Sequence, residues 1–141
     1  MNSIKQPQIT FVQVNTPQAK LEWITSTVQQ QFELGRRILI VAPNDEASRF
    51  VDQLLWKFQP EAFIPHAIIH QSATDIVAIT TRHQNLNRAH VLINLCPDAS
   101  PIAADFDYIF EMHDNTHPSK AQLSQQRQAF YQVAGHNTII R

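Results

Sequence analysis

The chain has 141 residues, of which 43% are hydrophobic and 16% charged, and its formal net charge is −1. This length fits residues 1–141 into one domain with a substantial core, and the near-zero charge excludes a strong general attraction to nucleic acid. The single cysteine excludes an intramolecular disulfide and no apolar run reaches the length of a bilayer span, so we expect a cytoplasmic protein without a membrane segment.

Strand and helix patterns alternate along the chain. In chain order, strands are predicted at 9–14, 38–42, 75–81, 90–95 and 107–112. Helices are predicted at 17–34, 45–58 and 118–135, and irregular segments at 62–74 and 137–141. The continuous apolar run 38–42 is typical of a strand that is buried on both faces of a sheet. The alternation predicts an α/β fold with an open, mostly parallel sheet and helices on both faces.

The chain contains only two glycines, Gly35 and Gly135, and each follows a predicted helix. Nucleotide-binding enzymes with this layout hold phosphate on a glycine-rich turn, because glycine lets the backbone approach the phosphate closely. The turns 14–17 and 42–45 contain no glycine, so we predict no nucleotide-binding loop, no cofactor and a binding module. The alternative is a nucleotide-binding enzyme with a degenerate phosphate loop.

Histidine pairs invite a metal-site interpretation. His66 and His70 are four residues apart, as are His113 and His117, but both pairs fall outside the predicted helices that would place the rings on one side. We therefore expect loop histidines and no metal site. No base is placed near Cys96, so we expect a buried structural thiol and no catalytic residue.

One tryptophan is out of place in the second predicted helix. The apolar stripe of this helix is predicted on Ala47, Val51, Leu54 and Phe58. Trp56 projects to the opposite side, because successive residues of an α-helix turn by about 100°. Either Trp56 contacts a partner, since tryptophan is enriched at binding hot spots, or an adjacent loop covers it. For the last helix, the stripe is predicted on Leu123, Phe130 and Ala134.

Several segments in a fixed order resemble the chi subunit of bacterial DNA polymerase III. They are G-R-R-I-L-I-V at 35–41, D-E-A at 45–47, L-W at 55–56, F-I-P-H at 63–66 and R-Q-A-F-Y-Q-V-A-G at 127–135. The likeness spans nearly the whole chain. It implies a Rossmann-like fold without a bound nucleotide and a non-catalytic accessory role in the clamp-loader complex of DNA replication.

The same resemblance implies protein partners. Members of this family pair with the small psi subunit, which tethers them to the clamp loader. They also bind the acidic C-terminal tail of single-stranded-DNA-binding protein, so that contact with DNA is indirect. A third interpretation is that the chain is a partner of a Rad3-type repair helicase.

For the tail, the resemblance implies a site with Trp56 as the pocket tryptophan. Tail recognition requires an apolar pocket for a terminal phenylalanine and cations for the carboxylates, and Lys57, Lys120 and Arg127 are the candidate cations. Where the family has basic and aromatic side chains on the last helix, this chain has Ala121, Gln125, Gln128 and Ala129. Tail binding is therefore weaker than in the family, shifted to the three candidate cations, or lost.

For psi, the resemblance points to the segment that contains Phe63, Ile64, Pro65 and His66. Pro65 restricts the preceding residue to extended geometry, so the segment can present Phe63 and Ile64 at the surface. The alternative is that both side chains cap the core beneath the second helix.

Overall fold

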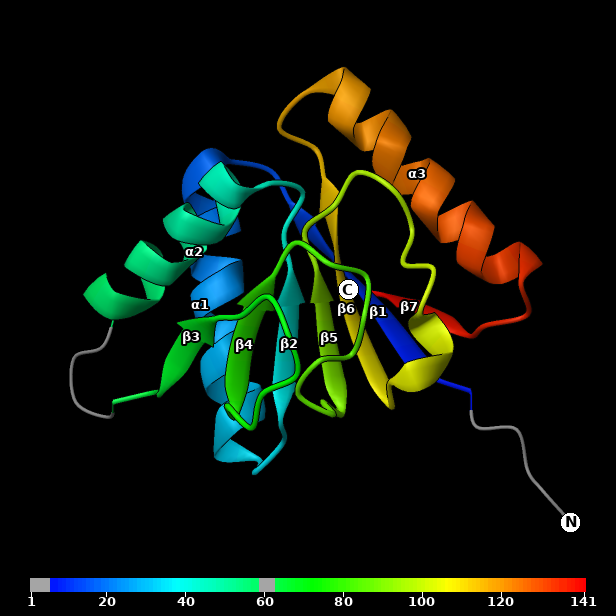
Figure 1. Cartoon of the computed structure of the whole chain (residues 1–141). Coiled ribbons are helices and arrows are strands. Elements are labelled where there is room, and N and C mark those ends of the chain that lie inside the picture. The colour runs from blue at the N-terminus through cyan, green and yellow to red at the C-terminus, as the bar shows by residue number, and fades with distance from the viewer. Residues whose placement is uncertain (1–5, 59–62) are drawn as a thin grey trace, which may run out of the picture.

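The computed structural model describes residues 6–58 and 63–141. Within these residues, one seven-stranded sheet packs against three α-helices (Figure 1). The strands are β1 (Gln8–Val14), β2 (Ile38–Val41), β3 (His66–Ile68), β4 (Val77–Thr80), β5 (Val91–Asn94), β6 (Tyr108–Asp114) and β7 (Thr138–Ile140). The helices are α1 (Pro17–Glu33), α2 (Asp45–Lys57) and α3 (Pro118–Val133), with a short 3-10 helix, η1 (Ala103–Asp105).

The sheet is open and its strand order is β3-β4-β2-β5-β6-β1-β7. Every strand pairing in the described part of the chain is parallel, which confirms the predicted α/β class and gives a Rossmann-like arrangement. All strands therefore end at the same edge of the sheet. We call this edge the carboxyl edge, and the opposite one the amino edge.

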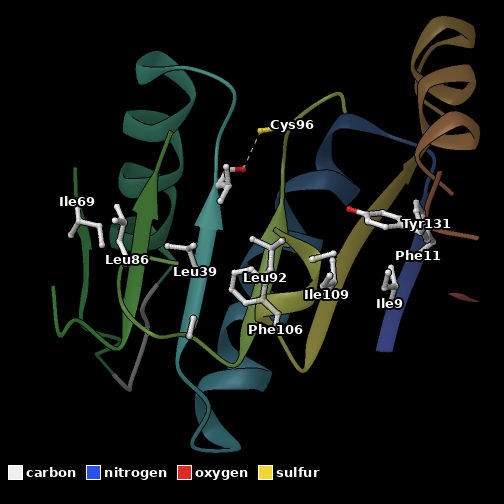
Figure 2. Packing of buried hydrophobic residues seen from close by; sticks show 14 residues of the cluster. Ile9, Phe11, Leu39, Ile69, Leu86, Leu92, Cys96, Phe106, Ile109 and Tyr131 are labelled. Carbon is white, nitrogen blue, oxygen red and sulfur yellow. Dashed lines mark hydrogen bonds between the residues drawn. The ribbon is translucent and has the colours of Figure 1, made fainter. Parts of the chain in front are cut away.

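Helices cover both faces of the sheet, as predicted. On β2, Ile38 and Ile40 belong to the core under α1 and α2, whereas Leu39 and Val41 face the other side. That other face carries a second core, which α3 covers only in part (Figures 1 and 2). The rest of this face is covered by the long connections after β4 and β5, through residues such as Leu86.

The helix ends follow from local sequence. The side chains of Thr16 and Asn44 each accept a hydrogen bond from the backbone N–H three residues ahead, at 3.1 and 2.8 Å, which caps α1 and α2. Gly35 and Gly135 follow α1 and α3 with φ of 75° and 89°, a left-handed conformation in which a side chain is strained. Among the described helices, none combines the length and apolar character that a bilayer span requires.

Two strands differ from the sequence-based prediction. β3 lies inside the segment 62–74 that was predicted to be irregular, and β7 lies in the predicted tail 137–141. Each has three residues and pairs along one side only, β3 with β4 and β7 with β1, at opposite edges of the sheet. Their conformation therefore depends on pairing with distant strands, which short-range patterns do not report.

The predicted core stripes of two helices were wrong in part. Of the stripe predicted for α2, Val51 is buried and Leu54 partly buried, but Leu55 is buried as well and Phe58, directly after the helix, is 45% exposed. In α3, Phe130 is 58% exposed and the predicted stripe faces outward. The inward face of α3 instead carries Ser124, Arg127 and Tyr131.

Candidate functional site

A network of buried polar side chains fixes α3 to the carboxyl half of the sheet. Its centre is Glu111 on β6, which is fully buried. The carboxylate accepts hydrogen bonds from Asn94 Nδ2 at 2.7 Å, Tyr131 OH at 2.6 Å and Arg127 Nε at 3.0 Å. Tyr131 OH in turn accepts a hydrogen bond from the backbone N–H of Ser100 at 2.8 Å. The network thus joins β5, β6, α3 and the connection after β5.

Burial dominates the electrostatics of this network. It raises the pKa of Glu111 to about 7, although the Arg127 cation and the donors on Tyr131 and Asn94 oppose the shift. Burial and the nearby Glu111 carboxylate also raise the pKa of the Cys96 thiol to about 11. Cys96 is therefore a neutral thiol at physiological pH, and its Sγ lies 3.8 Å from the Val41 carbonyl oxygen (Figure 2).

Arg127, one of the three candidate cations for the tail, is only 8% exposed. Its Nη1 donates to the Pro97 carbonyl at 3.1 Å, and its Nη2 donates to the Met112 carbonyl at 2.7 Å. Together with the ion pair to Glu111, these bonds commit the guanidinium to the interior. Arg127 is therefore not available as a free cation for the tail, because α3 is oriented so that this side chain faces the sheet.

A cavity of about 450 Å³ opens at the carboxyl edge, between the first turns of the three helices and the ends of β5 and β6. We call it the carboxyl-edge pocket. Its walls include the apolar side chains of Phe50, Leu123 and Met112, and Arg127 forms part of its lining. In open parallel sheets, ligands bind in the crevice at this edge.

Two lysines, Lys20 and Lys120, line the carboxyl-edge pocket. Lys20 pairs with Asp114 at 2.8 Å, so its charge is already compensated. Burial alone would raise the pKa of Asp114, but hydrogen bonds from Lys20 and Thr116 outweigh it and lower this pKa. Lys120 is exposed and forms no ion pair within the described residues. It is therefore the cation best placed to meet an anionic ligand here.

An exposed aromatic pair lies at the C-terminal end of α2, beside the edge strand β3 (Figure 1). Trp56 is 50% exposed, and its ring centroid lies 5.3 Å from that of Phe63, which is 58% exposed. The other neighbour of Trp56 is the buried His66 ring, at 4.7 Å. We call Trp56 and Phe63 the aromatic surface. Of the two alternatives for Trp56, each holds in part: half of the side chain is exposed, and residues of the segment 63–66 pack against its ring.

The four residues predicted for psi divide into an outer and an inner pair. Phe63 and Pro65 are exposed, whereas Ile64 and His66 are buried. His66 Nδ1 donates to the Ile64 carbonyl at 2.8 Å, and its Nε2 lies 3.5 Å from Asp52 Oδ1 on α2. Of the two alternatives for this segment, surface presentation holds for Phe63 and burial holds for Ile64, because His66 holds the segment against α2.

The structure separates the four residues predicted for the tail. Lys120 and Arg127 line the carboxyl-edge pocket, near the start and middle of α3. Trp56 and the exposed Lys57 lie at the end of α2 by β3, on the far side of the sheet (Figure 1). A single pocket built from all four residues is not formed. Within the described residues, no group of three or more His, Cys, Asp or Glu side chains is arranged to hold a metal ion.

The buried network was missed at the sequence level, although two signals for it exist. Glu111 interrupts an otherwise apolar strand pattern, and Ser124, Arg127 and Tyr131 recur at helical spacing. A charge inside an apolar strand requires a buried partner, and an arginine on a helix with this spacing can supply one.

Comparison with known proteins shows a family match that spans the carboxyl-edge pocket and the aromatic surface. The family described as "DNA polymerase III chi subunit, HolC" matches residues 7–138, a range that includes the carboxyl-edge pocket and the aromatic surface. The chain is similar to a Pseudomonas aeruginosa protein named "DNA polymerase III subunit chi", with 25% identity over 120 residues that cover 85% of this chain and 84% of the relative. It is also similar to the Escherichia coli (strain K12) protein of the same name, with 23% identity over 111 residues that cover 77% and 75%.

Proposed function

The chain belongs to the DNA polymerase III chi subunit family, and on this basis we propose that it is a non-catalytic accessory subunit of the clamp-loader complex in DNA replication. In this role it links the clamp loader, through the psi subunit, to single-stranded-DNA-binding protein. The turns after β1 and β2, which hold phosphate in nucleotide-binding enzymes, contain no glycine. This supports a binding role over nucleotide chemistry.

The carboxyl-edge pocket is the proposed site for the acidic tail. A tail that ends in phenylalanine needs an apolar cavity for the ring and a cation for the terminal carboxylate. Phe50 and Leu123 supply apolar walls, and Lys120 supplies an uncompensated positive charge beside them. This combination of apolar walls with a free lysine is the observation that carries the assignment. Arg127 contributes by shaping the pocket, because its own charge is paired with Glu111.

The aromatic surface is the proposed site for psi. Trp56 and Phe63 are half-exposed rings in contact with each other, and aromatic side chains of this kind dominate binding energies at protein interfaces. The pair is held in place from beneath by His66, so little side-chain order has to be gained on binding. Trp56 is therefore assigned to the psi surface instead of the tail pocket.

Calorimetry with a synthetic peptide of the single-stranded-DNA-binding protein C-terminus tests the tail assignment. Lys120→Ala should weaken binding about tenfold, because it removes one charge-assisted hydrogen bond. Lys57→Ala is the matched control, since Lys57 is an exposed lysine outside the pocket, and it should leave the affinity unchanged. Equal effects of the two substitutions would contradict the pocket assignment, and no binding by the unaltered protein would contradict the tail function.

Co-purification with psi tests the second assignment. Phe63→Ala should reduce the amount of complex recovered on gel filtration. Phe130→Ala provides a matched control, because Phe63 and Phe130 are both 58% exposed but Phe130 lies on α3. If both variants retain psi equally well, the aromatic surface is not the psi site.

A further inference from the structure

A second large cavity lies at the amino edge of the sheet, opposite the carboxyl-edge pocket. Its volume is about 640 Å³. The side chains that matter for its chemistry are Arg37, Ser72, Thr74, Asn85, Arg88 and His90. Arg37 directly precedes β2, His90 directly precedes β5, and Thr74 lies shortly before β4, so three adjacent central strands begin at this cavity. We call it the amino-edge pocket.

Two of the basic residues of the amino-edge pocket are held in place by hydrogen bonds. Arg37 Nη1 donates to the Thr74 carbonyl oxygen at 2.7 Å, which restrains the guanidinium at the pocket. The backbone N–H of Arg37 donates to His90 Nδ1 at 3.2 Å. Because Nδ1 is an acceptor there, the proton of the neutral imidazole is on Nε2, which is left as a donor.

Arg88 supplies the third basic group, from a strained position. It has φ of 53°, and it is the non-glycine residue with a positive φ in the described part of the chain. An arginine in this conformation costs on the order of 1 kcal/mol that glycine avoids. The preceding residue, Asn87, is fully buried and donates to the Ile38 and Asp75 carbonyls at 2.9 and 3.0 Å, yet its Oδ1 has no hydrogen-bond partner. The loop is thus rigidly anchored while it holds Arg88 at the pocket.

The charges around the amino-edge pocket favour an anion. Arg37 and Arg88 carry two fixed positive charges, and no carboxylate lines the pocket among the described residues. Asp75 and Asp107 lie at the same edge but are not part of its lining. Because the chain as a whole has a charge of −1, the pocket is positive against a weakly negative background.

We propose that the amino-edge pocket binds a phosphate group, carried either by a single-stranded nucleic acid or by a free nucleotide. Guanidinium groups match the geometry of phosphate oxygens, and the Ser72 hydroxyl and the His90 imidazole N–H in the same lining are further donors. The site is distinct from the crevice in which open parallel sheets usually bind nucleotides, since that crevice lies at the carboxyl edge. It does not depend on the proposed tail or psi surfaces.

The test compares two arginines of the same loop. Arg88 lines the pocket, whereas Arg82 is exposed, donates to the His70 carbonyl and is not part of the lining. Binding of pyrophosphate, AMP and a labelled short oligothymidylate is measured at low salt by calorimetry and fluorescence anisotropy. Arg88→Gln should weaken binding about tenfold, and Arg82→Gln, with the same change of charge, should leave it unchanged. For the oligothymidylate, Arg88→Gln should also reduce the slope of log affinity against log salt by about 0.7.

A second variant separates binding from folding. Arg88→Gly removes the guanidinium and relieves the positive φ, so it should lose binding while its melting temperature is at least that of the unaltered protein. Binding of pyrophosphate and AMP without the oligothymidylate assigns the site to free phosphate compounds, and binding of the oligothymidylate assigns it to a nucleic acid strand. The proposal is overturned if none of the three probes binds, or if Arg88→Gln and Arg82→Gln have equal affinity.

Discussion

Replacing Arg127 by methionine tests the buried network that fixes α3. Arg127 is 8% exposed and its guanidinium donates to Glu111, Pro97, Met112 and Ser124 at 2.7–3.2 Å. Methionine retains the apolar stem but leaves the Glu111 carboxylate buried without its cation. Breaking one side of a buried ion pair costs about 3–5 kcal/mol, a large part of the roughly 5–15 kcal/mol that stabilises a domain.

The loss of stability in Arg127→Met should also depend on pH. Burial already raises the pKa of Glu111 to about 7 with Arg127 present, and removal of the cation raises it further. Above about pH 7 the unaltered protein folds with Glu111 ionised, whereas the variant must bind a proton on folding. The stability deficit of Arg127→Met should therefore grow by up to about 1.4 kcal/mol for each pH unit above neutrality.

Urea denaturation followed by tryptophan fluorescence, to which the buried Trp23 and the half-exposed Trp56 contribute, measures both effects. Lys120→Met is the matched control, because it removes an exposed cation from the same helix and should change stability by less than about 0.5 kcal/mol. A deficit below about 1 kcal/mol for Arg127→Met, or one that is the same at about pH 5 and pH 8.5, would refute the structural role. The result matters for function, because an Arg127 variant that fails to bind the tail is informative only if it is folded.

Four further outcomes are expected. The folded-state pKa of Glu111, about 7, lies above its ordinary value of 4.5, so this group lowers the free energy of unfolding as pH rises from about 4.5 to about 7. Glu111→Gln should remove up to about 3 kcal/mol of this pH dependence, as measured by urea denaturation across the same pH range. Tyr131→Phe should cost about 1–3 kcal/mol, since it removes one of three donors to the Glu111 carboxylate and leaves the backbone N–H of Ser100 without its acceptor; a neutral effect would show that the hydroxyl is dispensable. Asn44→Ala should lower stability by about 1 kcal/mol through loss of the α2 cap, and an unchanged midpoint would argue against the cap. Trp56→Ala should leave the melting temperature within a few degrees, because half of the ring is already exposed, while it reduces psi binding; collapse of the fold would instead mark Trp56 as a core residue.

Much of the architecture could be predicted from the sequence because its signals are local. The apolar runs that became β2 and β5 are buried on both faces in any parallel sheet, so they predicted a sheet covered on two sides. The two glycines marked helix ends because each acts on backbone groups within a few residues. Helical geometry placed Trp56 away from the core stripe of α2 but left open whether an adjacent loop covers it; in the structure the ring is half-exposed and packs against Phe63 and His66.

The candidate sites depended on groups that are distant in the chain, and here only the tertiary structure decided. The inward face of α3 is set by Glu111 on β6, since a buried carboxylate draws Arg127 and Tyr131 toward it and leaves Phe130 outside. The edge strands β3 and β7 form because β4 and β1 offer them unpaired backbone groups. The sequence by itself thus determined the three helices, the five longer strands, their approximate ends and the mostly parallel class, because these depend on neighbouring residues. Packing between elements decided which cations are free and which are buried, because burial and ion pairing depend on residues far apart in the sequence. For the same reason, only the tertiary structure showed that Trp56 and Lys120 lie on separate surfaces.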